Sequence, residues 1–126
     1  MTKARRRSKH RDAVETVVRA AKGPLSAHEV REELRDSGIG IATVYRALND
    51  GVERGVFEPV EMPNGPTRYE PADRPHHHHF ECLECNRVYD IEGCLDGLPN
   101  LVPDGFSLEQ HEILLYGRCR KCSEDV

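Results

Sequence analysis

The chain has 126 residues, of which 37% are hydrophobic, 6% are aromatic and 32% are charged. This length suits one ordinary domain or two small ones, and the apolar content is thin for a single large core. No apolar run approaches the roughly 18 residues that cross a bilayer, and the N-terminal segment lacks the apolar stretch of a secretory signal. We therefore expect a cytoplasmic protein without a membrane partner.

The net charge of −4 conceals two halves of opposite sign. Residues 1–55 carry 12 Lys and Arg against 8 Asp and Glu, whereas residues 56–126 carry 6 against 14. The first half suits a polyanion and the second suits cations. The basic arm over residues 1–10 is, taken alone, more typical of a solvated tail than of a nucleic-acid contact, so charge does not decide the function.

Helical signals dominate the first half of the chain. Apolar residues at helical spacing predict a helix over residues 11–22, which a Gly-Pro pair ends. Ser26, followed three residues later by Glu29, has the pattern of a capping box and predicts the start of a second helix. The spacing of valines and leucines predicts a third helix over residues 41–54.

A β-hairpin is predicted directly after the third helix. Two extended runs, residues 56–62 and 67–71, flank the sequence Pro-Asn-Gly-Pro, and Asn-Gly readily forms tight turns. Three helices followed by a hairpin are the plan of a winged helix-turn-helix, whose third helix enters the major groove of DNA. Side chains there either contact DNA or pack and pair within the protein. The candidate DNA contacts are Thr43, Tyr45, Arg46 and Asn49.

A second module follows a short hinge. Residues 71–75, Pro-Ala-Asp-Arg-Pro, have the composition of a hinge, and residues 76–126 contain the strand-like segments HFECLEC, RVYDI and FSLEQHEILLYGRC. The connection between them is broken by Pro and Gly, so any helix there is short. A module of this size with few large apolar side chains is hard to stabilise by burial alone.

Two Cys-x-x-Cys pairs offer a metal staple for this module. In a reducing compartment such pairs indicate metal binding or redox chemistry rather than a disulfide framework. Four thiolates close a tetrahedron around Zn²⁺ and leave no open position, so the site is predicted to be structural. The alternative is a set of redox-active pairs. The candidate ligands are Cys82, Cys85, Cys119 and Cys122; the fifth cysteine, Cys94, is expected to be a buried or idle thiol.

Four consecutive histidines precede the first Cys pair. On a strand, successive side chains point to opposite faces, so one strand can supply two separate sites. Mixed nitrogen and oxygen ligands suit Fe²⁺, Mn²⁺ or Zn²⁺, and a solvated His cluster is the alternative. The first candidate set is Glu70, His77, His79 and Asp90, and the second is His76, His78 and His111.

The first set suggests a mechanism because Glu70 precedes the hinge and the other three ligands follow it. A metal bridging them would fix the relative orientation of the two modules. In a dimer this would set the spacing of two recognition helices, which must match DNA half-sites. Metal would then shift the population toward the state that binds DNA.

Three segments in this order, IATVYRAL, HHHHFECLECNRVYD and HEILLYGRCRKC, resemble the ferric uptake regulator (Fur) family over nearly the whole chain. The resemblance implies a homodimeric, metal-dependent repressor of metal-homeostasis genes that binds a double-stranded DNA operator. It implies an α+β fold, with a winged-helix domain over residues 1–70 and a zinc-stapled α/β dimerisation domain over residues 76–126. By position, it implies structural zinc on the four cysteines, a regulatory Zn²⁺ or Fe²⁺ on the first set, and a third site, filled in some members, on the second.

The chain departs from the family pattern in several places. Pro24 stands where many members have His, so the regulatory site has four ligands and favours tetrahedral Zn²⁺, or His28 takes that part. The segment after Cys85 is short, which truncates the usual dimerisation helix and leaves Asp96 as the acidic candidate for the third site. Glu70 stands where peroxide-sensing members tend to have Asp.

Other functions are less consistent with these residues. A peroxide-sensing regulator of the same family and a metal-binding module without DNA binding are the alternatives. A metalloenzyme such as a zinc hydrolase needs an open metal position beside a general base, and no H-E-x-x-H or similar spacing is present. We therefore expect a regulator and no enzyme.

Overall fold

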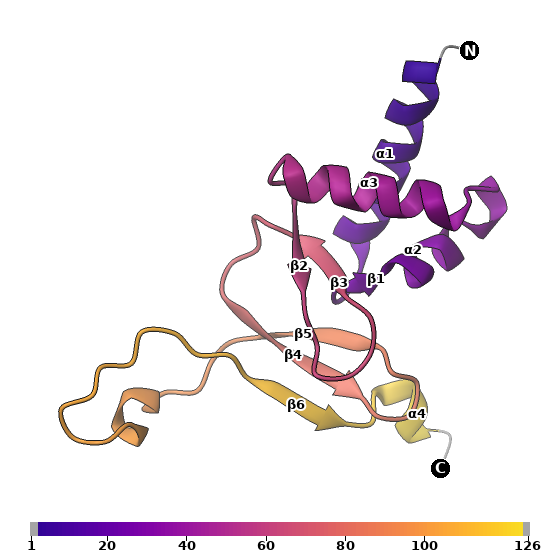
Figure 1. The fold of residues 1–126 in the computed structure, drawn as a ribbon. Helices are drawn as coiled ribbons and strands as arrows, with labels where there is room; N and C mark the ends of the chain where they lie inside the picture. Colours follow the sequence, from indigo (N-terminus) through magenta and orange to yellow (C-terminus); the bar gives the residue numbers. More distant parts are fainter. Residues whose placement is uncertain (1–2, 125–126) are drawn as a thin grey trace. The chain divides into compact units, whose positions relative to one another are not determined.

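The computed structural model describes residues 3–124, with side chains described for residues 9–124. The chain divides into two compact units, residues 1–74 and residues 75–126 (Figure 1). None of the described helices combines the length and the hydrophobicity that would let it cross a bilayer. The mixture of helices and small sheets is the predicted α+β class.

Unit 1 is built on the helices α1 (Lys3–Ala20), α2 (Ala27–Glu33) and α3 (Ile41–Glu53). Their order is as predicted, but α1 begins at Lys3 rather than at Arg11. The basic segment contains no Gly or Pro, so nothing in it interrupts the helix. The basic arm therefore continues α1 within the described residues.

The start of α2 is held by the predicted capping box. The Ser26 hydroxyl accepts a hydrogen bond from the Glu29 amide at 3.2 Å, and the Glu29 carboxylate accepts one from the Ser26 amide at 2.9 Å. The buried Arg68 guanidinium pairs with Glu29 and also donates to the Pro24 carbonyl at 3.3 Å. A local cap is thus tied to a strand more than 30 residues further along the chain.

A small antiparallel sheet completes unit 1. Its strands are β1 (Leu25–Ser26), β2 (Phe57–Val60) and β3 (Arg68–Pro71), in the order β1-β3-β2. The β2–β3 hairpin confirms the predicted hairpin, and the loop 61–67 connects its strands rather than a tight Asn-Gly turn. Strand β1 was not predicted, because two residues are too few to show alternation. Pro71 ends β3, and Arg74 donates to the Arg19 carbonyl at 3.1 Å, so most of the predicted hinge is held by unit 1.

The core of unit 1 lies between the helices and this sheet. It is made by apolar residues from every element, among them the fully buried Val14, Val18, Val30, Val44 and Leu48. On α3 the buried positions Val44, Leu48 and Gly51 follow helical spacing, as predicted for the first two. Gly51 allows the buried Phe57 ring to pack directly on the helix backbone.

Unit 2 is a sheet in the order β5-β4-β6 with a long connection (Figure 1). Strand β4 (His77–Cys82) pairs antiparallel with β5 (Val88–Glu92) and parallel with β6 (Leu114–Gly117). The connection from β5 to β6 contains only the short 3₁₀ helix η2 (Leu98–Leu101) among its described residues. Helix α4 (Arg120–Glu124) was not predicted, because it is too short for a periodic pattern.

Substituting Gly51 tests the packing of α3 on the sheet. A Cβ atom at Gly51 would lie 2.2 Å from Cδ2 of Phe57, whose side chain is 3% exposed. Overpacking of this kind costs about 1–3 kcal/mol, and the better helix propensity of Ala returns about 1 kcal/mol. We expect Gly51→Ala to lower the free energy of unfolding by about 1 kcal/mol in urea titrations followed by helical circular dichroism.

The matched control is Gly40→Ser. Gly40 is the N-cap of α3, has no side-chain cap bond, and leaves open space around an added Cβ. A serine there supplies the missing acceptor and should leave stability unchanged or raise it by about a few tenths of a kcal/mol. A Gly51→Ala variant as stable as the parent would contradict the Phe57 packing.

Candidate metal centres

The four predicted cysteines converge at one end of the sheet of unit 2. Cys82 ends β4, Cys85 lies in the turn after it, and Cys119 and Cys122 lie around the start of α4. Their sulfur atoms all lie within 4.8 Å of one another, and the Cys85 and Cys119 sulfurs are 3.9 Å apart. A tetrahedron with Zn–S bonds of about 2.3 Å separates its sulfurs by roughly 3.8 Å, so the donors fit Zn²⁺.

Backbone amides favour thiolates within this four-thiolate cluster. The amides of Cys85 and Cys119 donate to the Cys82 sulfur at 3.5 Å and 3.4 Å, and they lower the pKa of Cys82 to about 6. The amide of Cys122 lowers the pKa of Cys119 in the same way, because each Cys-x-x-Cys turn directs later amides at its first sulfur. The amides therefore favour the thiolate form of Cys82 and Cys119, which is the form that binds a cation.

Tyr89 supports the cluster from β5. Burial, together with a hydrogen bond to the Cys119 sulfur, raises the pKa of Tyr89 to about 12. The same hydrogen bond helps to lower the pKa of Cys119. The hydroxyl thus stays protonated and donates to the thiolate, which is the part played by an outer-shell partner of a metal ligand. The sequence search missed Tyr89 because only the β4–β5 pairing places it there.

A second cluster lies on the face of β4 and β5 that carries His77, His79 and Asp90. The register places His79 directly opposite Asp90, and both His Nε2 atoms lie 3.6 Å from one Asp90 carboxylate oxygen. The Pro75 carbonyl contacts His77 Nδ1 at 2.8 Å, which leaves Nε2 to face the cluster. This His/Asp cluster can offer two imidazoles and one carboxylate to a cation.

Two further residues predicted for this site belong to unit 1. Glu70 is buried on β3, directly opposite Glu58 in the register of the hairpin. His28 is exposed on α2, where its ring meets the ring of Tyr45 edge-on with centroids 6.4 Å apart. The roles of Glu70 and His28 as metal ligands remain predictions.

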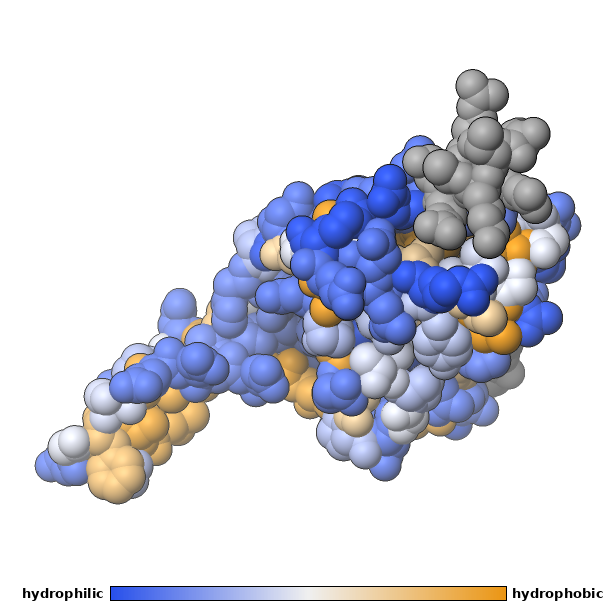
Figure 2. Space-filling view, turned by 45° about the horizontal axis from the view of Figure 1, so that its top comes forward, coloured by the Kyte–Doolittle hydropathy of each residue, from blue (hydrophilic) through white to orange (hydrophobic). Residues whose placement is uncertain are grey.

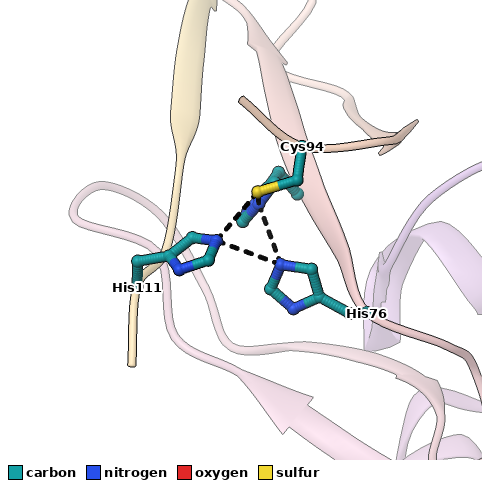
Figure 3. Close-up of side chains that lie close together, drawn as sticks. His76, Cys94 and His111 are labelled. Carbon is teal, nitrogen blue, oxygen red and sulfur yellow. Dashed lines mark hydrogen bonds between the residues drawn. The ribbon is translucent and has the colours of Figure 1, made fainter. Parts of the chain in front are cut away.

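The other face of β4 brings together His76, His78 and His111, and adds Cys94. The four donor atoms lie within 4.8 Å of one another, and Figure 3 shows His76, Cys94 and His111 pointing to one place. Burial and the neighbouring imidazoles lower the pKa of His78, which keeps it in the neutral form that binds metals. Cys94 is exposed rather than buried, and it occupies the place for which Asp96 was considered.

The residues predicted to contact DNA all lie on α3, and their contact with DNA stays a prediction. Tyr45 is 40% exposed, and Arg46 and Asn49 are also exposed, whereas Thr43 is half-buried. Arg46 donates to the Thr43 hydroxyl at 3.1 Å. Among the described residues, Asp50 forms ion pairs with Arg11 and Arg54, whereas Arg46 forms none. The exposed guanidinium of Arg46 can therefore reach an anion.

Helices followed by a hairpin, joined to a sheet with clustered Cys and His donors, define a metal-binding protein of the α+β class. The model of the ferric uptake regulator family matches residues 2–116. The chain belongs to the ferric uptake regulator family, whose members are transcription regulators rather than enzymes.

Individual relatives agree with this assignment. The chain is 32% identical over 98 residues to the ferric uptake regulation protein of Campylobacter upsaliensis. The match covers 75% of this chain and 63% of that protein, so the chain spans less than two thirds of that relative's length. The Helicobacter pylori ferric uptake regulator, described with three functional metal binding sites, is 25% identical with a TM-score of 0.67, over 91% of this chain and 80% of that one. FurB from M. tuberculosis, a zinc uptake regulator, is 28% identical with a TM-score of 0.51. That match covers 93% of this chain and 95% of FurB.

Removing the Tyr89 hydroxyl tests its support of the four-thiolate cluster. Loss of an outer-shell partner costs about 10–100-fold in metal affinity. We expect Tyr89→Phe to lose zinc to a competing chelator at least about tenfold more readily than the parent. Tyr116→Phe removes a hydroxyl from a side chain that is 47% exposed, and it should behave as the parent does. Equal zinc retention in all three proteins would contradict the role of Tyr89.

Proposed function

We propose that this protein is a metal-responsive, DNA-binding repressor that controls metal-homeostasis genes in the cytoplasm. The observation that carries the proposal is that the described residues contain two kinds of metal-ligand cluster and, separately, an exposed pair of candidate DNA contacts. One face of β4 presents the His/Asp cluster, the end of the same strand presents the four-thiolate cluster, and α3 of unit 1 presents an exposed Tyr-Arg pair. Family membership supports the combination.

The four-thiolate cluster is proposed to hold a structural zinc. Its donors are spaced for a closed tetrahedron, and unit 2 buries few apolar side chains, among them Val88 and Cys82. A bound zinc supplies folding free energy to a module whose core is small. It has no open position at which a metal-bound reactant could be activated, so its role is structural rather than catalytic.

The regulatory metal is proposed to bind His77, His79 and Asp90, with Glu70 as the fourth ligand. Two imidazoles and two carboxylates suit Zn²⁺ or Fe²⁺ and hold them less tightly than four thiolates. Four ligands favour Zn²⁺ as the sensed ion, with Fe²⁺ second. Relatives named for iron and for zinc uptake support both. Because Glu70 comes from unit 1, occupation of this site would favour one arrangement of the two units.

The operator is proposed to be read by α3. Tyr45, Arg46 and Asn49 lie on its exposed face, and Thr43 orients Arg46 through their hydrogen bond. Arginine suits both phosphates and base edges in the major groove. A homodimer would present two such helices to two half-sites. Exposed Leu115 and Tyr116 on β6, at the edge of the sheet in unit 2, support a dimer contact there.

Metal-dependent DNA binding is the first test of this proposal. The protein with zinc in the four-thiolate cluster is mixed with genomic fragments, and bound DNA is selected with and without added Zn²⁺ or Fe²⁺. We expect the parent to retain specific fragments only when metal is added. His79→Ala lacks a ligand of the regulatory metal, so added metal should no longer increase its DNA binding. His28→Ala tests the alternative ligand, since an exposed bystander should leave the response unchanged. Binding that ignores metal in every condition would refute the proposal.

The role of α3 is tested with Arg46→Ala. An arginine that contacts a base edge contributes about 1–3 kcal/mol, so affinity for the selected fragment should fall roughly 5–150-fold. Arg54→Ala is the matched control, because Arg54 lies at the other end of α3 and pairs with Asp50 at 2.8 Å. Equal affinity and equal salt dependence in both variants would favour a metal-binding module that does not touch DNA.

A further inference from the structure

We propose that Cys94 is the fourth ligand of the third site that the family pattern assigns to His76, His78 and His111, so that three imidazoles and one thiolate make this site specific for Zn²⁺. We call these four residues the His/Cys cluster. The site is separate from the proposed regulatory site, because His78 leaves β4 on the face opposite to His77 and His79. Its distinguishing member is Cys94, which gives the site a soft, charged donor where a carboxylate was expected from the sequence.

The spacing of the donor atoms fits one small cation. The Nε2 atom of His76 lies 3.1 Å from that of His78 and 3.2 Å from that of His111. The Cys94 sulfur lies 3.2 Å from His78 Nε2 and 2.9 Å from His111 Nε2. Tetrahedral Zn²⁺ with bonds of about 2.0–2.1 Å to nitrogen and about 2.3 Å to sulfur separates its donors by roughly 3.3–3.6 Å. Small movements of the side chains would admit the ion.

Hydrogen bonds alone do not account for this arrangement. The four contacts form a closed ring of four polar atoms, and each contact needs one proton between its two atoms. A ring nitrogen carries either one proton or one lone pair, so it either donates or accepts but cannot do both. His76 Nε2 would have to share that single proton or lone pair between His78 and His111, so the four contacts cannot all be linear hydrogen bonds. A cation at the centre satisfies all four donors at once.

His78 is the most firmly placed ligand. Its side chain is 3% exposed, and the Ile113 amide contacts Nδ1 at 3.1 Å, which directs Nε2 into the cluster. The Ile113 amide donates to Nδ1, so the ring proton lies on Nε2. An ion on Nε2 would require that proton on Nδ1 instead, so the hydrogen bond from Ile113 would have to open, and Cys94 would release its thiol proton to solvent. Occupation of the site is thus coupled to the residue that precedes β6.

The donor set selects a class of metal. Imidazole suits Zn²⁺, Cu, Fe and Ni, whereas thiolate favours Zn²⁺ and Cu(I) over harder ions. Three neutral rings and one thiolate close a tetrahedron, which is the preferred geometry of Zn²⁺. We therefore assign the site to Zn²⁺ and expect Co²⁺ to serve as its spectroscopic substitute.

The site also closes the long connection of unit 2. Cys94 and His111 lie near the two ends of the segment 95–110, which projects from the sheet in Figure 1. Its exposed apolar residues include Leu101 at 78% and Phe106 at 68%, and Figure 2 shows apolar surface toward the end of this projection. An ion bound by Cys94 and His111 would hold both ends of this segment beside His78 of β4, which would limit its movement.

Cobalt substitution tests the assignment of Cys94. The full-length protein is purified with zinc, treated with a mild chelator that leaves the four-thiolate zinc in place, and titrated with Co²⁺. The four-thiolate cluster stays filled with zinc, which metal analysis verifies. A sulfur-to-cobalt charge-transfer band in the near ultraviolet then reports Cys94. We compare the parent with Cys94→Ser, His111→Ala and His79→Ala.

The expected result is a band in the parent and in His79→Ala that is absent in Cys94→Ser. His111→Ala should weaken cobalt binding at this site by more than the roughly 10–100-fold caused by loss of an outer-shell partner. Cys94 is exposed, so its replacement should leave the fold and the tightly held zinc unchanged. Equal spectra for the parent and Cys94→Ser would overturn the assignment. Metal-independent DNA binding would refute only the proposed function and would leave this result standing.

Discussion

The parallel pairing of β4 and β6 is the constraint on which the metal chemistry of unit 2 depends. Parallel strands run in the same direction, so their starts lie together and their ends lie together. His111 precedes β6 and meets His76 at the start of β4, whereas Cys119 follows β6 and meets Cys82 at the end of β4. An antiparallel β6 would exchange these partners and dissolve both clusters.

Alternation along β4 separates the remaining ligands. His77 and His79 leave one face, His78 leaves the other, and the register with β5 sets Asp90 directly opposite His79. A slip of one residue would move every side chain to the opposite face. A core of about 50 residues rarely supplies more than about 3–5 kcal/mol, whereas structural zinc contributes about 10–16 kcal/mol in zinc-finger peptides. Metal and register therefore depend on each other: the pairing builds the sites, and bound zinc would hold the pairing.

Local signals in the sequence predicted most of the elements. The capping box at Ser26, the helical spacing of α3 and the hairpin around Asn-Gly all depend on neighbours within a few residues. The structure contains the capping box, the helix and the hairpin, whose connection is the longer loop 61–67. The elements that sequence reasoning missed are the two-residue β1 and the five-residue α4, which are too short for any periodicity. The start of α1 was placed too late because a basic segment without breakers has no apolar stripe.

Site residues were predictable where spacing carries the chemistry. Two Cys-x-x-Cys pairs and alternating histidines identify donors from the sequence. Within the described part of unit 2, the structure brings together the four cysteines, the three histidines of the second set, and His77, His79 and Asp90 of the first. Cys94 and Tyr89 had no such signal. Cys94 lies 16 residues after His78 and 17 before His111, and only the folded connection makes them neighbours. An odd cysteine near unmatched histidines was the one hint available.

Donor chemistry ranks the three clusters that share β4. The four-thiolate cluster offers four soft anionic donors, the His/Cys cluster one, and the His/Asp cluster none. For Zn²⁺ this order predicts decreasing affinity, because each exchange of thiolate for a harder or neutral donor weakens the bond. A sensor must be partly empty at ordinary metal levels, since a saturated site cannot report a rise in metal. The proposed assignment of sensing to the cluster without thiolate satisfies this requirement, and it leaves the sites with thiolates to shape the unit that carries it.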